Sequence, residues 1–578
     1  MSKGTVHVLD YGAGNVRSLR NAISALGYEC VDVGSPAELA SVESLIFPGV
    51  GSFGFCMAQL RERGYVEALK AYLAADKPFL GICLGLQTLF EASEESPGVA
   101  GLGVIRGTVQ RFTDPSVAVP HMGWNTLRAA PAHEGSALLD GVAGSEVYFV
   151  HSFRALASDG NAEWVQTYSD HGDSAFISSL RKGRVMATQF HPEKSGAAGL
   201  RMLGNFLAAA QGTLPWPAAA AVDVDAPAAV VRTVLAKRVI ACLDVRSNDA
   251  GDLVVTKGDQ YDVREAAPAE NVAPAKGGTG RRGSVDGSGE VRNLGKPVEL
   301  AARYYAEGAD EVTFLNITSF RESPLEDLPL KAVLEAASVN VFVPLCIGGG
   351  IRNYVDSAGA KHSALDVAAE YFRSGADKVS IGSDAVVAAQ AWYESDGGLT
   401  GSTAIETISY TYGAQAVVIS VDPRRVYTAT ADALPAQGKL PAPVVIALPE
   451  GEEGPAGEKF AWYAATVRGG RETTALDAVG LARACEALGA GEILLNCINK
   501  DGTNSGFDCG LVRAVKQAVG IPVIASSGAG KPEHFSEVFA ATDVEAALAA
   551  GIFHRREVPI WAVKQHLQDS KFPIRRSE

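Results

Sequence analysis

The stretch RVIACLDV, residues 238–245, is an almost unbroken apolar run that carries a carboxylate, Asp244, near its end. A short, continuous apolar run is typical of a strand that is buried on both faces. Seven comparable runs follow, most of them separated by segments with a helical pattern: EVTFLNI (311–317), VPLCIGG (343–349), DKVSIGS (377–383), AVVISVD (416–422), EILLNCI (492–498), PVIASSG (522–528) and EAALAAGIF (545–553). Eight buried strands that alternate with helices predict a (β/α)8 TIM barrel.

The eight runs fall into two similar halves. Four pairs of like residues recur at offsets of 178 to 181 positions: Asp244 and Asp422, Gly349 and Gly528, Asn316 and Asn496, Gly308 and Gly489. One such offset can arise by chance, but four of them indicate an internal repeat. We therefore predict a barrel built from two half-barrels.

The carboxyl ends of the strands are where this architecture places its active sites. Asp244 and Asp422 end the first and fifth runs, so we expect them to face each other as a general acid and base, although a lone aspartate there is often a helix cap. The glycine clusters at 348–350 and 526–530 form either tight turns or phosphate cradles. Their symmetry favours two phosphate sites and a substrate with a phosphate at each end.

Charged residues stand at the opposite, amino ends of four runs. Arg238, Glu311, Lys378 and Glu492 supply two cations and two carboxylates. They predict either a salt-bridged plug in the barrel floor or a gate for something small and neutral. Lys257, in the loop after the first run, either closes over the substrate or is a solvated lysine.

A second site is predicted from PFLGICLGLQTLF, residues 78–90. An apolar strand runs into a helical pattern at Cys83, and a thiol on such a corner is exposed and stabilised as a thiolate by the helix N-terminus. A core cysteine beside packing glycines is the alternative. Far downstream, VMATQFHPEKS (185–195) supplies His191 as a base and Glu193 as the carboxylate that orients it.

The glycine-rich turn LIFPGVGSFG, residues 45–54, offers backbone amides for an oxyanion, with the Leu84 amide as the second donor. His121 and His151 are rival bases. Neither has an adjacent carboxylate, so both are interpreted as packing or substrate-side residues.

Composition limits the class of partner. A net charge of −15 argues against nucleic acid or an anionic membrane surface, and no stretch has the length and purity of a membrane span. The eight scattered cysteines predict reduced thiols rather than disulfides or zinc. Because a strand begins almost at once, we expect no signal peptide and a cytoplasmic location, or a plastid if a transit peptide has been removed.

The domain boundary is predicted from a change in composition. QGTLPWPAAAAVDVDAPAAVV (211–231) is rich in proline and alanine, so we expect a domain at 1–212, a linker at 213–236 and a second domain at 237–578. Two inserts are expected in the second domain: a low-complexity, disordered one near 265–290 and a surface excursion near 433–459.

These motifs carry a resemblance to a known family. GICLG (81–85) and FHPEKS (190–195) resemble the class I glutamine amidotransferases, whose fold is an open, flavodoxin-like α/β sheet. YGAGN, PGVGSFG and PHMGWN narrow the resemblance to the glutaminase of the imidazole glycerol phosphate synthase family. The second domain is similar to the cyclase of that family in ACLDV, FLNITS, IGGGIR, VSIGSDA, NKDGTNSGFD and ASSGAG. One polypeptide that carries both parts resembles the family's fused form.

The resemblance implies a bifunctional enzyme that hydrolyses glutamine and passes ammonia through the barrel. In the barrel, the acceptor phosphoribulosyl-formimino aminoimidazole carboxamide ribotide would be cyclised and cleaved to imidazole glycerol phosphate and the carboxamide ribotide, in histidine biosynthesis. It implies Cys83, His191, Glu193, Asp244 and Asp422 as catalytic residues. Glutamine and the oxyanion would be held by Val50, Gly51, Leu84, Gln87, Tyr148 and Ser152. The phosphorylated substrate would be held by Lys257, Gly349, Gly350, Ser383, Asp501, Gly528 and Gly530.

The resemblance also favours the gate interpretation of the four charges, because the glutaminase must then dock on the barrel floor within one chain. No cofactor, metal or obligate protein partner is implied. Two departures from the family pattern stand out: Asn499 replaces an expected aspartate, and the loop after the first strand is unusually long.

Three rival functions remain at this point. The barrel could be a related ribotide isomerase, although that reaction needs no ammonia. The chain could be a non-catalytic glutamine sensor, although the catalytic set is intact. It could be a thiol peptidase, which the attached phosphate-binding barrel disfavours.

Overall fold

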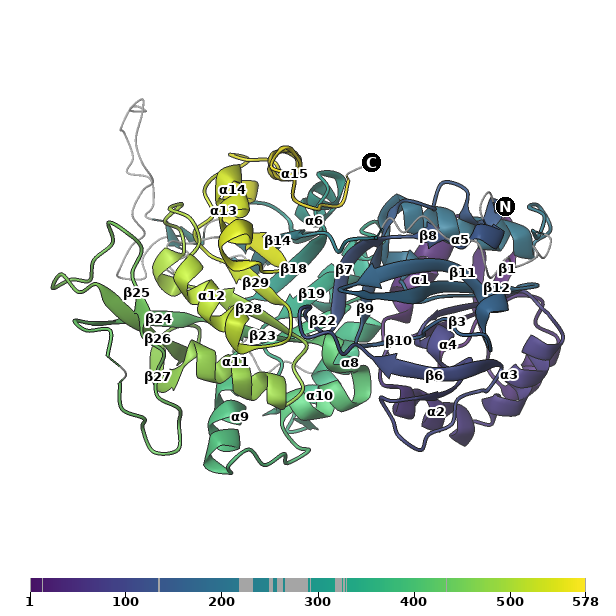
Figure 1. The fold of residues 1–578 in the computed structure, drawn as a ribbon, viewed down its shortest axis with the longest axis horizontal. Coiled ribbons are helices and arrows are strands. Elements are labelled where there is room, and N and C mark those ends of the chain that lie inside the picture. The colour runs from purple at the N-terminus through teal and green to yellow at the C-terminus, as the bar shows by residue number, and fades with distance from the viewer. Residues whose placement is uncertain are drawn as a thin grey trace.

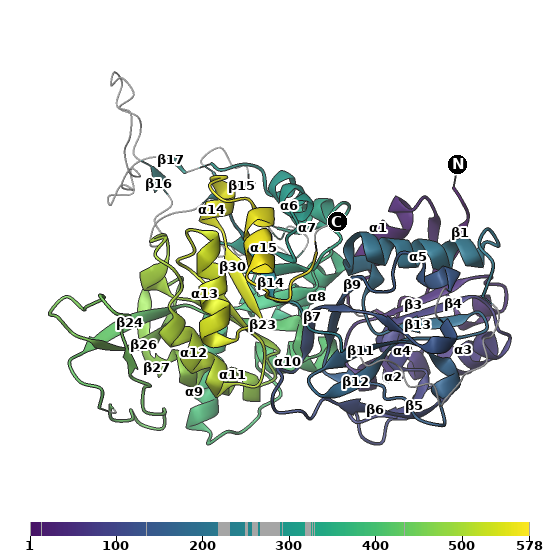
Figure 2. The ribbon, with the colours of Figure 1, turned by 45° about the horizontal axis from the view of Figure 1, so that its top comes forward.

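The computed structural model describes residues 2–12, 14–133, 136–217, 232–248, 253–256, 264–265, 290–291, 293–317, 325, 328, 330–432 and 434–576. These residues form two α/β domains that lie side by side (Figures 1 and 2). Lys257, most of the linker and residues 266–289 of the first insert lie outside the described residues.

The N-terminal domain is built on a mixed eight-stranded sheet. Its strand order is β2 (Glu29–Asp32), β1 (Thr5–Val8), β3 (Leu45–Gly49), β4 (Phe79–Cys83), β13 (Val185–Thr188), β12 (Ser174–Lys182), β11 (Val165–His171) and β8 (Arg128–Ala129). The first five strands are parallel, as an open α/β sheet predicts, and the last three are an antiparallel extension that the sequence did not suggest.

Side chains alternate between the two faces of this sheet. Ile46 and Leu80 pack on one face with helices α1 (Val16–Ala25) and α5 (Gly196–Ala210). Phe47 and Phe79 pack on the other with α2 (Phe53–Glu62) and α3 (Tyr65–Ala74). Both faces are therefore covered, as the apolar runs at Leu45 and Phe79 require.

Shorter strands complete the domain. A three-stranded sheet contains β5 (Phe90–Ser93), β6 (Ile105–Arg111) and β10 (Phe153–Arg154), and a two-stranded one contains β7 (His121–Thr126) and β9 (Glu146–His151). In Figures 1 and 2, β7 and β9 lie at the junction with the second domain.

The second domain is a closed parallel barrel, and each of the eight apolar runs is one of its strands. In order they are β14 (Arg238–Ser247), β18 (Glu311–Asn316), β19 (Leu345–Gly348), β22 (Lys378–Ile381), β23 (Val417–Val421), β28 (Glu492–Asn496), β29 (Val523–Ser526) and β30 (Ala546–Ala549). Pairing of β14 with β30 closes the ring.

Helices surround the barrel. They are α6 (Pro297–Ala306), α7 (Lys331–Ala337), α8 (Ala364–Arg373), α9 (Ser383–Glu394), α10 (Ala404–Tyr412), α11 (Ala478–Ala487), α12 (Cys509–Ala518), α13 (Pro532–Thr542), α14 (Gly551–His554) and α15 (Ile560–Asp569). Within the described ranges, no helix has both the length and the apolar character needed to cross a bilayer.

Side chains along β14 alternate between the inside and the outside of the barrel, and the inward-facing ones run from one end of the barrel to the other. Ile240 and Cys242 belong to a small apolar cluster inside the ring, whereas Val239 and Leu243 pack outward against the helices. Arg238 and Asp244 share the inward parity of Ile240. Six residues of strand separate them by about 20 Å, so one marks the floor and the other the mouth.

Excursions extend the barrel mouth. β14 continues three residues past Asp244 and pairs antiparallel with β15 (Leu253–Thr256), so Asp244 lies within the strand rather than at its end. After β23, the chain forms β24 (Pro423–Thr428), β25 (Ile446–Ala447), β26 (Phe460–Val467) and β27 (Glu472–Asp477). In both views these four strands lie at the end of the barrel away from the N-terminal domain. The second predicted insert runs between β24 and β26, and most of its described residues are exposed or half-buried.

Candidate functional site

Cys83 stands where β4 meets the short helix α4 (Leu84–Gln87), with a positive φ of 51°. Such a backbone costs about 1–3 kcal/mol for a residue with a side chain and is typical of functional sites. The flanking glycines have a packing reason: a Cβ on Gly85 would lie 2.2 Å from the Phe47 carbonyl oxygen, and one on Gly81 would lie 2.7 Å from that of Gly85. Both interpretations of the motif therefore apply: the glycines are needed for packing, and their small size permits the sharp turn that carries the Cys83 thiol.

His191 and Glu193 follow β13, the strand that pairs with β4, and β4 ends at Cys83. The His191 Nδ1 lies 2.8 Å from Glu193 Oε1, and both side chains are buried. Burial alone would lower the pKa of His191, but the neighbouring Glu193 and Cys83 raise it well above its usual range. The imidazole is therefore a strong proton acceptor that is oriented by a carboxylate.

A cavity opens beside the thiol. Its lining is formed by Gly49, Val50, Gly51, Cys83, Leu84, Gln87, Glu95, Val150, His151, Ser152, Phe153, His191 and Gln415. Seven of the predicted glutaminase residues are among them. Glu95, His151, Phe153 and Gln415 were not assigned to glutamine, and Gln415 comes from the barrel domain.

Tyr148 differs from the expectation that it holds glutamine. It does not line this cavity, and its side chain is buried beside Lys378, Glu311 and Arg238 of the barrel floor. Its backbone, rather than its ring, supports the site, because the Tyr148 carbonyl accepts the His191 N–H at 2.9 Å.

The glycine-rich turn at 49–52 is held between the two domains. Tyr11 donates its hydroxyl to the Val50 carbonyl at 2.6 Å, and the Ser52 N–H donates to the Thr411 carbonyl of α10 at 3.4 Å. Gly51 has a φ of 128°, and a Cβ there would lie 2.9 Å from the same Thr411 oxygen. Glycine at this position is therefore required by the turn and by close contact with the barrel domain.

Glu95 is a carboxylate in the cavity wall that sequence reasoning missed. It accepts the Phe53 N–H at 2.8 Å. Burial raises its pKa to about 7, against the opposing effects of that hydrogen bond and of Arg111. A glutamate eight residues after α4 gives no sequence signal of its own, because only the fold returns it to the cavity.

The barrel floor contains the four predicted charges in mutual contact. Arg238 Nη1 lies 3.0 Å from Glu311, and Lys378 Nζ lies 2.7 Å from both Glu311 and Glu492. Arg238 also pairs with Glu492, so each cation contacts both carboxylates. All four side chains are at most 1% exposed. Burial opposes their charge, yet the facing carboxylates raise the pKa of Lys378, so it remains charged.

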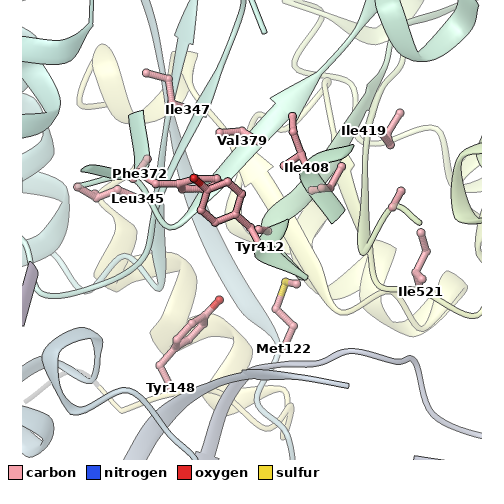
Figure 3. Close-up of a cluster of buried hydrophobic side chains, with 14 of the residues drawn as sticks. Met122, Tyr148, Leu345, Ile347, Phe372, Val379, Ile408, Tyr412, Ile419 and Ile521 are labelled. Carbon is pink, nitrogen blue, oxygen red and sulfur yellow. The ribbon is translucent and has the colours of Figure 1, made fainter. Parts of the chain in front are cut away.

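The N-terminal domain lies directly against this floor. In Figure 3, Met122 and Tyr148 lie in one cluster of buried side chains with the barrel residues Leu345 and Tyr412, and Met122 Sδ lies 3.6 Å from Lys378 Nζ. Two polar contacts flank them. Lys194, next to Glu193, pairs with Asp377 at 2.7 Å. Trp124 donates to the Asp310 carbonyl at 3.1 Å.

At the barrel mouth, Asp244 lies in β14, and Asp422 directly follows β23 on the opposite side of the ring. Asp422 Oδ1 accepts a hydrogen bond from Asn496 at 2.9 Å. Asp244 Oδ1 has the Cys242 thiol at 3.8 Å. The pair therefore faces the mouth from both half-barrels, as the repeat predicts.

The two glycine clusters have the same geometry in both halves. Gly349 (φ 93°) and Gly528 (φ 96°) each bring a would-be Cβ to 2.2 Å from a neighbouring carbonyl oxygen, that of Asn316 or Gly506. Tight glycine turns of this kind can present backbone amides to an anion; the Gly530 N–H donates to His534 Nδ1 at 3.1 Å. Gly350 also has a positive φ, of 83°, whereas a Cβ on Gly530 would lie 2.5 Å from the Asn504 oxygen. Asp501 is buried, and Ser383 accepts the Arg468 N–H at 2.9 Å.

Comparisons with known proteins cover both domains. The family model for class I glutamine amidotransferases matches residues 7–210, and the one for histidine biosynthesis proteins matches residues 238–559. The chain is 54% identical over 575 residues to the chloroplastic imidazole glycerol phosphate synthase hisHF of Arabidopsis thaliana, covering 99% of this chain and 90% of that protein. It is 51% identical over 582 residues to hisHF of Emericella nidulans, covering 99% of both chains. It is 50% identical over 567 residues to hisHF of Schizosaccharomyces pombe, covering 97% and 98%.

Proposed function

The chain belongs to the family of fused imidazole glycerol phosphate synthases, and on this premise we propose how its residues carry out that reaction in histidine biosynthesis. Glutamine is hydrolysed at Cys83, and the ammonia is used at the barrel mouth. One observation supports this most directly: the cavity beside Cys83 includes Gln415 of the barrel, so one domain completes the site of the other.

In the first half-reaction, Cys83 attacks the carboxamide carbon of glutamine. His191 takes the thiol proton and returns it to the departing ammonia, while Glu193 keeps the imidazole oriented and stabilises its charged form. The Leu84 amide and an amide of Val50 or Gly51 stabilise the oxyanion, each such donor being worth about 2.7–4 kcal/mol. Water then hydrolyses the thioester by the same groups in reverse.

Glutamine recognition is assigned to the polar part of the cavity wall. Gln87 and Ser152 are suited to the polar groups of the substrate, as the family resemblance implies. Glu95 adds an anionic partner for the α-ammonium group, which the sequence alone did not offer. Tyr148 is not assigned to glutamine, and its place beside the floor charges suits the passage of ammonia instead.

Ammonia then enters the barrel through the floor. Free ammonia becomes ammonium in water near neutral pH, and burial favours the neutral form. Arg238, Glu311, Lys378 and Glu492 act as the gate. Because each cation is paired with both carboxylates, this gate is closed as it stands, and we expect acceptor binding at the mouth to open it.

In the second half-reaction, Asp244 and Asp422 act as general acid and base on the bisphosphorylated acceptor. Its phosphates are held at the turns of Gly349 and Gly350, with Ser383, and of Gly528 and Gly530, with Asp501. Lys257 is assigned to the reacting end of the acceptor from the resemblance alone. The products are imidazole glycerol phosphate and the aminoimidazole carboxamide ribotide.

The proposal is tested with Cys83→Ala and Asp244→Asn in the full chain, using glutamine or ammonium as the nitrogen source. Cys83→Ala should lose glutamine-dependent synthesis and keep the ammonium-dependent reaction. Asp244→Asn should lose both. Normal cyclisation by Asp244→Asn would show that the acid–base assignment is wrong.

Two rival functions predict different results. A ribotide isomerase barrel would convert its substrate without any nitrogen source. A glutamine sensor would bind glutamine without hydrolysing it. The cellular location stays a prediction: the cytoplasm from the sequence, or a plastid, as the name of the Arabidopsis relative states for that protein.

A further inference from the structure

A side chain outside the predicted catalytic set contacts the nucleophile. Gln189 lies just past β13, is fully buried, and places its Nε2 at 3.4 Å from Cys83 Sγ. Gln189 and His191 stand two residues apart in the extended chain after β13, and Glu193 follows in the 3-10 turn Pro192–Lys194.

The orientation of the Gln189 amide is determined by its neighbours. Gln87 Nε2 lies 3.0 Å from the Phe153 carbonyl oxygen, which can only accept, so this atom is a nitrogen donor. The same Gln87 Nε2 lies 3.2 Å from the other end of the Gln189 amide, which must therefore be the oxygen. The end of Gln189 that faces the sulfur is consequently the NH2 group.

Two buried histidines, His121 and His151, belong to the same hydrogen-bond network, because His151 shares the Phe153 carbonyl with Gln87. His151 Nδ1 donates to the same Phe153 oxygen at 2.8 Å, which leaves its Nε2 as an acceptor for His121 Nδ1 at 3.2 Å. Asn125 Nδ2 then donates to His121 Nε2 at 3.2 Å. Burial lowers the pKa of His151 to about 3, so this neutral tautomer holds at neutral pH. Because both nitrogens of each ring are engaged, neither histidine acts as a base.

We propose that Gln189 is a hydrogen-bond donor to the Cys83 thiolate and fixes the sulfur in line for attack. An N–H donor to a charged acceptor stabilises it more than a donor to a neutral one. Gln189 therefore favours the reactive form of the nucleophile, while His191 and Glu193 move the proton. The inference rests on the proposed role of Cys83.

The test uses the full chain with Gln189→Met, which keeps the volume and removes the amide, and Gln189→Glu, which turns an oxygen toward the sulfur. Expected losses in kcat for glutamine hydrolysis are about tenfold for the methionine and about a hundredfold for the glutamate variant, with KM within about twofold. The rate of Cys83 alkylation by iodoacetamide at pH 7 should fall by similar factors, with Cys83→Ala as the blank for the other thiols.

Thr188→Val is the matched control. Thr188 precedes Gln189 and is equally buried. Its hydroxyl donates a hydrogen bond to the Phe190 carbonyl at 2.9 Å. It should leave both rates within about twofold, and ammonium-dependent synthesis should be normal in all of these variants. An unchanged alkylation rate in Gln189→Met, or an equal loss in Thr188→Val, would overturn the proposal. Glutamine hydrolysis by Cys83→Ala would instead refute the role of Cys83 itself.

Discussion

The barrel carries two clusters of two cations and two carboxylates, one at each end. The floor cluster consists of Arg238, Glu311, Lys378 and Glu492. The mouth cluster consists of Arg425, Glu452, Lys500 and Asp508. In the mouth cluster, Glu452 joins Arg425, at 2.6 Å, to Lys500, and Arg425 also pairs with Asp508.

The clusters differ in origin and burial. Every floor residue opens a barrel strand and is sealed beneath the N-terminal domain. In the mouth cluster, Glu452 comes from the second insert and its side chain keeps 32% exposure. Equal charge composition therefore has unequal consequences: an unpaired charge is costly where water cannot reach it and mild where water can.

The largest effect is expected from Glu492→Gln in the floor. Glu492 contacts both cations, so its loss leaves a buried positive charge without compensation. We expect about 3–5 kcal/mol of lost stability in the barrel, measured by urea unfolding. A loss below about 1 kcal/mol would mean that water reaches the floor, and the contrast between the two ends would disappear.

A second prediction concerns Glu95, a half-buried carboxylate that forms no salt bridge within the part of the chain that the structure describes. With its pKa raised to about 7, Glu95 becomes neutral as the pH falls below 7 and then loses its attraction for the α-ammonium group of glutamine. The KM for glutamine should rise about tenfold from pH 8 to pH 6. Glu95→Gln should show a high KM that does not follow pH over this range.

A third prediction compares the loss of one floor charge with the loss of a complete ion pair. Lys378→Met combined with Glu311→Met replaces one cation and one carboxylate by apolar groups and leaves Arg238 paired with Glu492. The double variant should lie within about 1–2 kcal/mol of the wild type, because replacing a buried pair is far milder than breaking it. A double variant as unstable as Lys378→Met alone would contradict this account.

The smallest effect is expected from Glu452→Gln in the mouth. Water reaches Glu452 and Arg425 keeps its pair with Asp508, so the loss should cost about 1 kcal/mol in urea unfolding, most of it from Lys500, whose side chain is 6% exposed. Glu453→Gln is the control, since Glu453 stands next to it and, among the residues described, pairs with the exposed Lys459 alone. A loss of stability near that of Glu492→Gln would mean that an unpaired charge is as costly at the mouth as in the floor.

Sequence patterns predicted much of this molecule. The apolar runs located all eight barrel strands, because a strand buried on both faces needs such a run. The Cys83 corner followed from glycine spacing, and the floor charges from their places at the strand starts. The antiparallel half of the first sheet and Glu452 escaped prediction, because strand pairing and the return of an insert depend on contacts between residues far apart.

Asn499 illustrates the same limit. It stands where an aspartate was expected, and its Oδ1 accepts the Arg425 N–H at 2.8 Å, a role that an amide fills as well as a carboxylate. Tyr148 illustrates the opposite case, in which a family role did not fit the place that the fold gives the ring.

The amino-acid sequence by itself predicted the barrel and singled out Cys83, His191, Glu193 and the two aspartates as candidates, because each depends on local periodicity, turn chemistry or an internal repeat. Tertiary structure alone decided which side chains line the cavity beside Cys83, that Gln415 of the barrel is one of them, and that Gln189 faces the sulfur. Those features depend on distances between segments up to several hundred residues apart, and the packing of the two domains sets these distances.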